Sequence, residues 1–142
     1  FPDATGATRN EEKPVPARPP QGKGEHIIVV EDDEELLDIA LSTLTTLGYE
    51  ASGARDAQQA QHLMRSAPPA DLLLCDVVLP NGISGPGFVV QVRQSEPDIK
   101  VIFMSGYPRK SHAQLLEIDE LLLAKPFERA QLVHAIHESL NR

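Results

Sequence analysis

Residues 26–50 of this chain, HIIVVEDDEELLDIALSTLTTLGYE, decide its fold. The run Ile27-Ile28-Val29-Val30 is β-branched and unbroken, which is typical of a strand buried on both faces. Residues 33–47 then repeat leucine and alanine at helical spacing, and Gly48 follows as a stop signal. A buried strand, a short acidic connection and an amphipathic helix together predict the first unit of an α/β protein.

The same alternation continues to the end of the chain. Further strands are predicted at 49–52, 72–75, 99–104 and 120–124. Further helices are predicted at 56–65, 108–117 and 128–140, and one more follows a loop at 80–87 and ends at about residue 95. Five apolar strands that alternate with five helices over short connections predict parallel strands. The expected fold is therefore an open, doubly wound α/β sheet with helices on both faces.

Composition narrows the class of protein. The 142 residues include 21 Asp and Glu against 13 Lys and Arg, a formal charge of −8, which argues against direct binding of nucleic acid. No apolar run approaches the ~20 residues that span a bilayer, and no signal peptide is visible. The single cysteine, Cys75, excludes an intramolecular disulfide or a multi-cysteine zinc site and fits a reducing compartment. We expect a cytoplasmic domain without membrane contact.

The first 24 residues differ from the rest. They hold five of the twelve prolines, and Phe1 and Val15 are their only large apolar side chains. Such a segment buries too little surface to offset the entropy of ordering it. We predict a disordered, proline-rich linker at 1–24 and a globular domain at 25–142.

Polar side chains stand where four of the predicted strands end. The first strand is followed by Glu31 and Asp32, the third by Asp76, the fourth by Ser105 and the fifth by Lys125. In a doubly wound sheet, chemistry takes place at the carboxyl ends of the strands. Carboxylates that converge there repel one another unless a cation lies among them, and oxygen ligands suit a hard divalent ion such as Mg²⁺.

The remaining polar residues are interpreted more simply. Residues 33–35 are acidic because acids favour the first turn of a helix. Cys75 is expected to be a small buried hydrophobe. His134 and His137 are expected on the solvated face of the last helix, and Tyr107 either faces a partner or covers the site.

Four separated motifs now resemble one known family. They are residues 29–33 (VVEDD), Asp76 with Leu79-Pro80 and Gly85, residues 101–107 (VIFMSGY) and residues 124–127 (AKPF). Together, and in this order, they resemble the receiver domain of two-component response regulators from about residue 26 to residue 142. The resemblance implies a flavodoxin-like fold with strand order 2-1-3-4-5. It also implies a signalling module that catalyses its own phosphorylation and slow dephosphorylation.

The resemblance assigns a role to each acidic residue of the predicted site. Asp76 would be the phosphoacceptor, which attacks a phosphohistidine on a partner kinase. Asp32 would bind Mg²⁺ directly and Glu31 directly or through water. Asp76 and the backbone carbonyl of Val78 would complete the protein ligands.

The resemblance also assigns roles to the residues at the other strand ends, and the chain differs from the family pattern at one position. Ser105 would hydrogen-bond a phosphoryl oxygen, Lys125 would pair with the phosphoryl group or with Asp76, and the Lys125-Pro126 bond would be cis. The family often has an aromatic switch residue three positions before this lysine, where the chain has Leu122. Coupling is therefore expected to run through the backbone of 106–118, and the helix at 108–117 to be short or mobile.

A phosphorylated receiver has three alternatives. A haloacid-dehalogenase-like phosphatase needs a second aspartate two residues after its nucleophile, where this chain has Val78, and room for a cap domain. A flavodoxin-like mononucleotide binder would place a phosphate against Glu31-Asp32-Asp33, which would repel it unless a metal intervened. A degenerate receiver that only binds partners is the strongest alternative.

Two features predict the parent protein. Phe1-Pro2 resembles the last strand of a histidine kinase ATP-binding domain, and residues 104–108 (MSGYP) are similar to receivers at the C-terminus of hybrid sensor kinases. The resulting hypothesis is the C-terminal receiver of a bacterial hybrid histidine kinase. Its partner would be a histidine kinase or its own kinase core, with a histidine phosphotransfer protein as a further candidate.

Overall fold

A computed structural model describes residues 22–66, 69–106 and 121–141. Within these residues, five parallel strands form one sheet in the order β2-β1-β3-β4-β5, which confirms the predicted fold class and strand order. The strands are β1 (His26–Val30), β2 (Glu50–Ala54), β3 (Leu72–Asp76), β4 (Lys100–Ser105) and β5 (Leu121–Ala124). The helices are α2 (Glu34–Thr46), α3 (Ala57–Ser66), α4 (Gly85–Ser95) and α5 (Arg129–Leu140), with a 3₁₀ turn, η1, at Pro80–Gly82.

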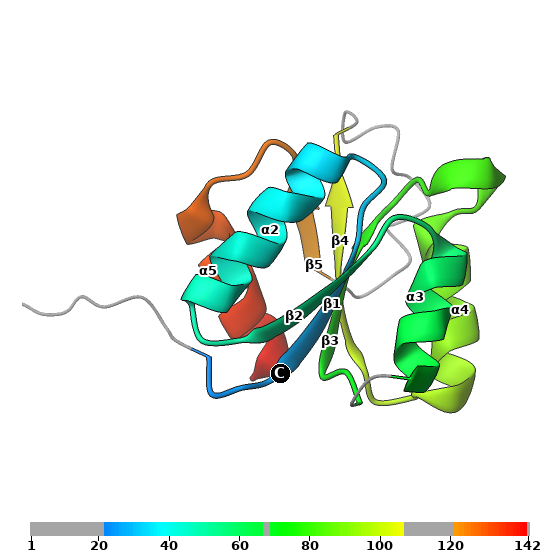
Figure 1. The fold of residues 1–142 in the computed structure, drawn as a ribbon, viewed down its shortest axis with the longest axis horizontal. Helices are drawn as coiled ribbons and strands as arrows, with labels where there is room; N and C mark the ends of the chain where they lie inside the picture. The colour runs from blue at the N-terminus through cyan, green and yellow to red at the C-terminus, as the bar shows by residue number, and fades with distance from the viewer. Residues whose placement is uncertain (1–21, 67–68, 107–120, 142) are drawn as a thin grey trace, which may run out of the picture.

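The sheet lies between two layers of helices. Helices α2 and α5 cover one face and helices α3 and α4 the other (Figure 1). Successive residues of β1 point to opposite faces, so Ile27 and Val29 pack in the core under α2 and α5, while Ile28 and Val30 pack under α3 and α4. This double burial explains why the first strand has no polar residue between positions 27 and 30.

The acids that follow the first strand form the start of α2. The Asp33 side chain is the N-cap and accepts hydrogen bonds from the N–H groups of Glu35 (3.0 Å) and Leu36 (3.2 Å). Glu34 and Glu35 occupy the first turn, where the helix dipole favours negative charge. The interpretation of residues 33–35 as a helix start is confirmed.

Other predicted boundaries need correction. The predicted end of the loop at 80–87 is wrong, because α4 already begins at Gly85. Ser84 is the N-cap of this helix, and its Oγ accepts a hydrogen bond from the N–H of Gly87 at 2.9 Å. The strand predicted at 49–52 runs at Glu50–Ala54 instead. The predicted helix at 108–117, Tyr107 and residues 1–21 of the predicted linker lie outside the described residues.

Residues 22–24, the end of the predicted linker, contact the domain. The N–H of Gly22 donates to the carbonyl of Leu47 at 2.6 Å, and that of Gly24 donates to Gly48 at 3.0 Å. The chain therefore reaches β1 along the turn between α2 and β2. Among the described residues, no helix is long and apolar enough to cross a membrane.

Candidate functional site

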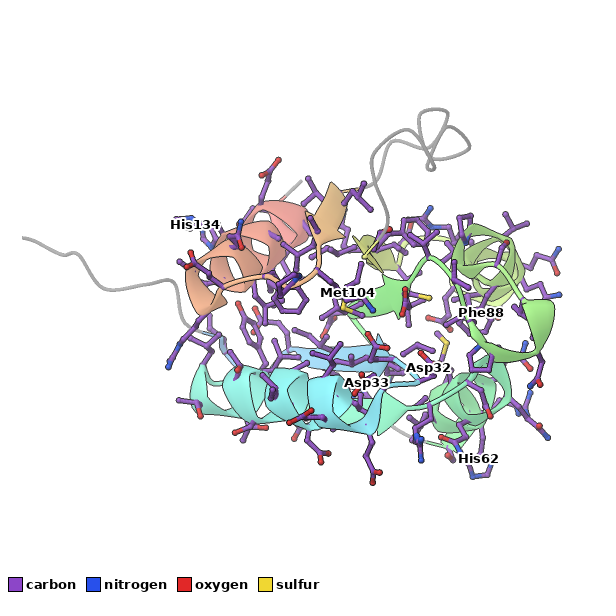
Figure 2. All side chains as sticks on the ribbon, turned by 90° about the horizontal axis from the view of Figure 1, so that it is seen from above. Asp32, Asp33, His62, Phe88, Met104 and His134 are labelled. Carbon is purple, nitrogen blue, oxygen red and sulfur yellow. The ribbon has the colours of Figure 1, made fainter. Side chains whose placement is uncertain are left out.

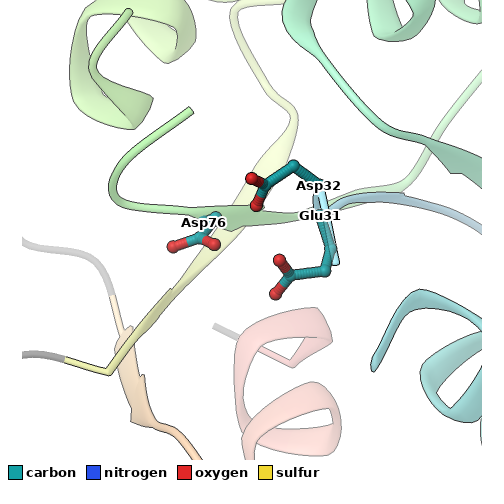
Figure 3. Close-up of side chains that lie close together, drawn as sticks. All are labelled: Glu31, Asp32 and Asp76. Carbon is teal, nitrogen blue, oxygen red and sulfur yellow. The ribbon is translucent and has the colours of Figure 1, made fainter. Parts of the chain in front are cut away.

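Three carboxylates meet at the carboxyl edge of the sheet. Glu31 and Asp32 follow the last residue of β1, and Asp76 is the last residue of β3. The two strands pair Val30 with Cys75, so Glu31 and Asp76 lie side by side. The side chains point toward one another (Figure 3), and one ligand oxygen from each lies within 4.8 Å of the others. The predicted cluster of Glu31, Asp32 and Asp76 is thus assembled in the structure.

Lys125 connects two of these carboxylates. Its Nζ donates to Glu31 Oε1 at 2.8 Å and to Asp76 Oδ2 at 2.9 Å. Glu31 and Asp76 are buried, with 2% and 6% of their surface exposed. Two buried acids would destabilise each other without a cation, and Lys125 supplies one positive charge between them.

The contacts around Lys125 shift the pKa values of two groups. Burial raises the pKa of Glu31, although the hydrogen bonds from Lys125 and from the Asp33 N–H oppose the shift. Burial alone would lower the pKa of Lys125, but the hydrogen bonds and charges of Glu31 and Asp76 outweigh it and raise that pKa. Lys125 is therefore a cation at neutral pH. The three carboxylates and this ammonium leave a formal charge of −2, which one divalent cation would neutralise.

The remaining predicted site residues lie around this cluster. Ser105, the last residue of β4, is buried, and its carbonyl accepts the Lys125 N–H at 2.7 Å. The bond between Lys125 and Pro126 is cis, as the resemblance implied. Val78 lines the same pocket as Asp32, and its N–H donates to Asp76 Oδ1 at 3.4 Å. All six residues predicted for the site thus lie at one edge of the sheet.

Gly85, the first residue of α4, contacts the backbone of Asp76. Its N–H donates to the carbonyl of Val77 at 2.6 Å, and a Cβ built on Gly85 would overlap the carbonyl oxygen of Asp76. Only glycine lets the helix approach β3 this closely. The absence of a side chain at Gly85 therefore helps to set the position of Asp76.

Gly85→Ala is expected to destabilise the fold by about 3 kcal/mol, because the new methyl group meets backbone that cannot turn aside. Urea unfolding of the variant measures this loss. Gly87→Ala is the matched control, since its Cβ would meet the Ser84 hydroxyl, a side chain that can turn. The control should change the free energy of unfolding by less than about 1 kcal/mol. Equal stabilities for the two variants would contradict the close approach at Gly85.

Residues outside the cluster occupy the places expected of structural groups. Cys75 is fully buried, and this burial raises the pKa of its thiol. The negative charges of Asp76 and Glu31 raise that pKa further. His134 and His137 are exposed on α5, and His134 lies on the outer side of that helix, away from Asp32 (Figure 2). Leu122 is 44% exposed on β5.

One residue at this edge was missed by the sequence analysis. Arg55 follows β2, and its Nη2 donates to the carbonyl of Asp32 at 3.3 Å. The strand prediction ended at Ser52, which placed Arg55 inside a loop. An accurate end for β2 would have added Arg55 to the residues that follow a strand.

The sequence profile of the response regulator receiver domain matches residues 27–137. The chain belongs to this family. It is therefore a receiver domain of two-component signalling. Members of this family bind Mg²⁺ at an acidic pocket and interact with histidine kinases and regulators. The match covers the strand ends that carry the cluster.

Curated relatives of this receiver domain include both kinases and regulators. It is 31% identical over 119 residues to the sensor kinase CckA of Brucella abortus, covering 82% of this chain and 12% of the relative. It is 32% identical over 123 residues to YrkP of Bacillus subtilis, an uncharacterized transcriptional regulatory protein, covering 82% of this chain and 49% of the relative. The chain thus spans half or less of the length of these relatives.

Solved receiver structures are similar over nearly their whole length. The signal receiver domain of an HD domain-containing protein from Pseudomonas fluorescens matches with a TM-score of 0.73 and 30% identity, covering 83% of this chain and 95% of that one. A response regulator receiver protein from Sinorhizobium medicae matches with a TM-score of 0.74 and 25% identity, covering 84% of this chain and 96% of that one. The unit common to these proteins is the receiver domain itself.

Proposed function

We propose that Asp76 accepts a phosphoryl group from the phosphohistidine of a histidine kinase in a Mg²⁺-dependent reaction. The observation that carries this proposal is the position of the Asp76 carboxylate. It is buried, one of its oxygens is held by the Lys125 ammonium, and Asp32 and Glu31 lie beside it. A nucleophile, a cation and a set of oxygen ligands are the parts that phosphoryl transfer needs.

The donor set fits a hard divalent cation. Glu31, Asp32 and Asp76 offer only carboxylate oxygens, and the backbone carbonyl of Val78 is the fourth ligand in the proposal. The formal charge of −2 around the cluster favours binding of such an ion. When bound, Mg²⁺ would supply charge neutralisation for the phosphoryl oxygens.

The chain's own residues would carry the transfer. An Asp76 carboxylate oxygen forms a bond to phosphorus while the bond from phosphorus to the histidine nitrogen breaks, and its electron pair stays on the imidazole. The product is an acyl phosphate on Asp76. Lys125 is proposed to move its hydrogen bond from the Asp76 carboxylate to the phosphoryl group, and the Ser105 hydroxyl to donate to another phosphoryl oxygen.

The partner in this proposal is a histidine kinase, and the receiver would lie in the cytoplasm as the C-terminal part of a hybrid kinase. The similarity to a sensor kinase supports this origin, and the similarity to a regulatory protein supports a separate regulator instead. A histidine phosphotransfer protein would be the next acceptor if the phosphoryl group is passed on. The degenerate receiver is less favoured, because Asp32, Asp76 and Lys125 are all present. Ligand oxygens of Asp32 and Asp76 lie within 4.8 Å of each other, and Lys125 forms an ion pair with Asp76.

The test is the intact mass of the protein after incubation with acetyl phosphate and Mg²⁺. We expect the addition of one phosphoryl group, and no addition when EDTA is present before the donor, because the carboxylates then repel the anionic donor. Binding of beryllofluoride in the presence of Mg²⁺ checks the same site without turnover. A protein that takes up neither ligand and binds no divalent cation would instead be a degenerate interaction module.

A further inference from the structure

Arg55 is held beside the candidate metal site by the backbone around it. The pairing of β1 and β2 continues one step beyond the strand, since the Glu31 N–H donates to the carbonyl of Ala54 at 3.0 Å. The N–H of Arg55 donates to Gln59 Oε1 at 2.8 Å, from the first turn of α3. These two hydrogen bonds therefore hold the backbone of Arg55 close to Asp32.

The peptide group between Asp32 and Asp33 is held from both sides. Its N–H, on Asp33, donates to Glu31 Oε2 at 3.1 Å, and its carbonyl, on Asp32, accepts from Arg55 Nη2 at 3.3 Å. A peptide group is planar, so two hydrogen bonds on opposite sides restrict its rotation. Rotation of this plane would change the ψ angle of Asp32, on which the allowed rotamers of its side chain depend.

From these contacts we infer that Arg55 is a positioning residue for Asp32 and thereby strengthens divalent cation binding. The inference rests on the proposed function, in which Asp32 is a metal ligand. Arg55 has two opposite effects on an ion in this site. Its positive charge repels the ion, but its side chain is exposed, so water and salt screen that repulsion. The hydrogen bond to the Asp32 carbonyl preorganises the ligand, and we expect this effect to be the larger one.

The sign of the change in metal affinity tests the inference. Mn²⁺, which also takes oxygen ligands, serves as the probe, and its free concentration is read from its electron paramagnetic resonance signal. Arg55→Met is expected to weaken Mn²⁺ binding about two- to tenfold, the range that corresponds to loss of one hydrogen bond. Arg55→Lys, which keeps the charge and a donor, is expected to lose less. Unchanged or tighter binding by Arg55→Met would overturn the inference.

A second arginine provides the matched control. Arg93 Nη2 also donates to a backbone carbonyl, that of Ile99, at 3.1 Å, but before β4 and therefore at the opposite edge of the sheet. Arg93→Met should leave the affinity for Mn²⁺ unchanged. Thermal unfolding followed by circular dichroism checks that each variant is folded. In phosphorylation by acetyl phosphate, Arg55→Met should raise the half-saturating Mg²⁺ concentration and leave the rate at saturating Mg²⁺ nearly unchanged.

The same measurements separate this inference from the proposed function. A wild-type protein that binds no Mn²⁺ would overturn both, because no metal site would then exist to be positioned. A wild-type protein that binds Mn²⁺, and loses it on Asp32→Asn, supports the proposed site. Within that outcome, the Arg55→Met affinity alone decides whether Arg55 positions Asp32.

Discussion

Asp76→Asn is expected to take up no phosphoryl group from acetyl phosphate under conditions in which the wild type is phosphorylated. The amide that replaces the carboxylate has no negatively charged oxygen to attack phosphorus, so the loss should be complete. The variant should remain folded, because it removes one of three neighbouring carboxylates and leaves the ion pair of Lys125 with Glu31. Intact mass after incubation with donor and Mg²⁺ is the measurement, with circular dichroism to check folding.

Asp98→Asn is the matched control for Asp76→Asn. Asp98 is exposed and lies just before β4, at the edge of the sheet opposite to the site. The control should gain one phosphoryl group as the wild type does, and treatment with hydroxylamine should remove it if the bond is an acyl phosphate. A phosphoryl group that still appears on Asp76→Asn would place the acceptor at another residue.

Lys125→Met is expected to change catalysis and metal binding in opposite directions. Removing the ammonium takes away the cation that would stabilise the transferred phosphoryl group, so the rate of phosphorylation should fall by about 100-fold or more. The same change removes a positive charge that lies 2.8 Å from Glu31 and 2.9 Å from Asp76. Mn²⁺ binding should therefore become tighter, by about tenfold. The rate comes from intact mass over time and the affinity from the Mn²⁺ resonance signal.

The Lys125→Met variant also carries a stability signature. Without Mg²⁺, two buried carboxylates are left without their cation, so thermal unfolding should occur at a lower temperature than in the wild type. Mg²⁺ should restore much of that loss, because binding to the folded state stabilises it. Lys100→Met, at the amino end of β4, is the control and should show neither effect. Weaker Mn²⁺ binding by Lys125→Met would mean that the lysine organises the carboxylates rather than competing with the ion.

Local sequence pattern was sufficient for most of the fold because periodicity depends on nearby residues. The apolar run at 27–30 and the helical repeat at 33–47 identify β1 and α2 without any distant contact. The end of the second strand was harder to predict. Gly53 and Ala54 have low strand propensity, yet they pair with Val29 and Val30 of β1, and that pairing extends β2 beyond Ser52.

The list of candidate site residues followed from the same local logic, since parallel strands bring their carboxyl ends to one edge. The order of the sheet, and hence which strand ends are neighbours, came from the family resemblance and was confirmed by the pairing of β1 with β2 and β3. The contact of Arg55 with Asp32 was missed, because it depends on where β2 ends and on which strand lies beside it.

The chain's own pattern thus determined the alternation of strands and helices, the acidic edge of the sheet and the identity of Asp76, Asp32 and Lys125 as candidates. Only the tertiary structure decided how these groups interact. Lys125 reaches Glu31 across 94 positions of sequence and Asp76 across 49, and Gly85 is needed because a helix meets the backbone of Asp76. Such contacts depend on packing between elements that are distant in sequence, and no local periodicity encodes the distance between them.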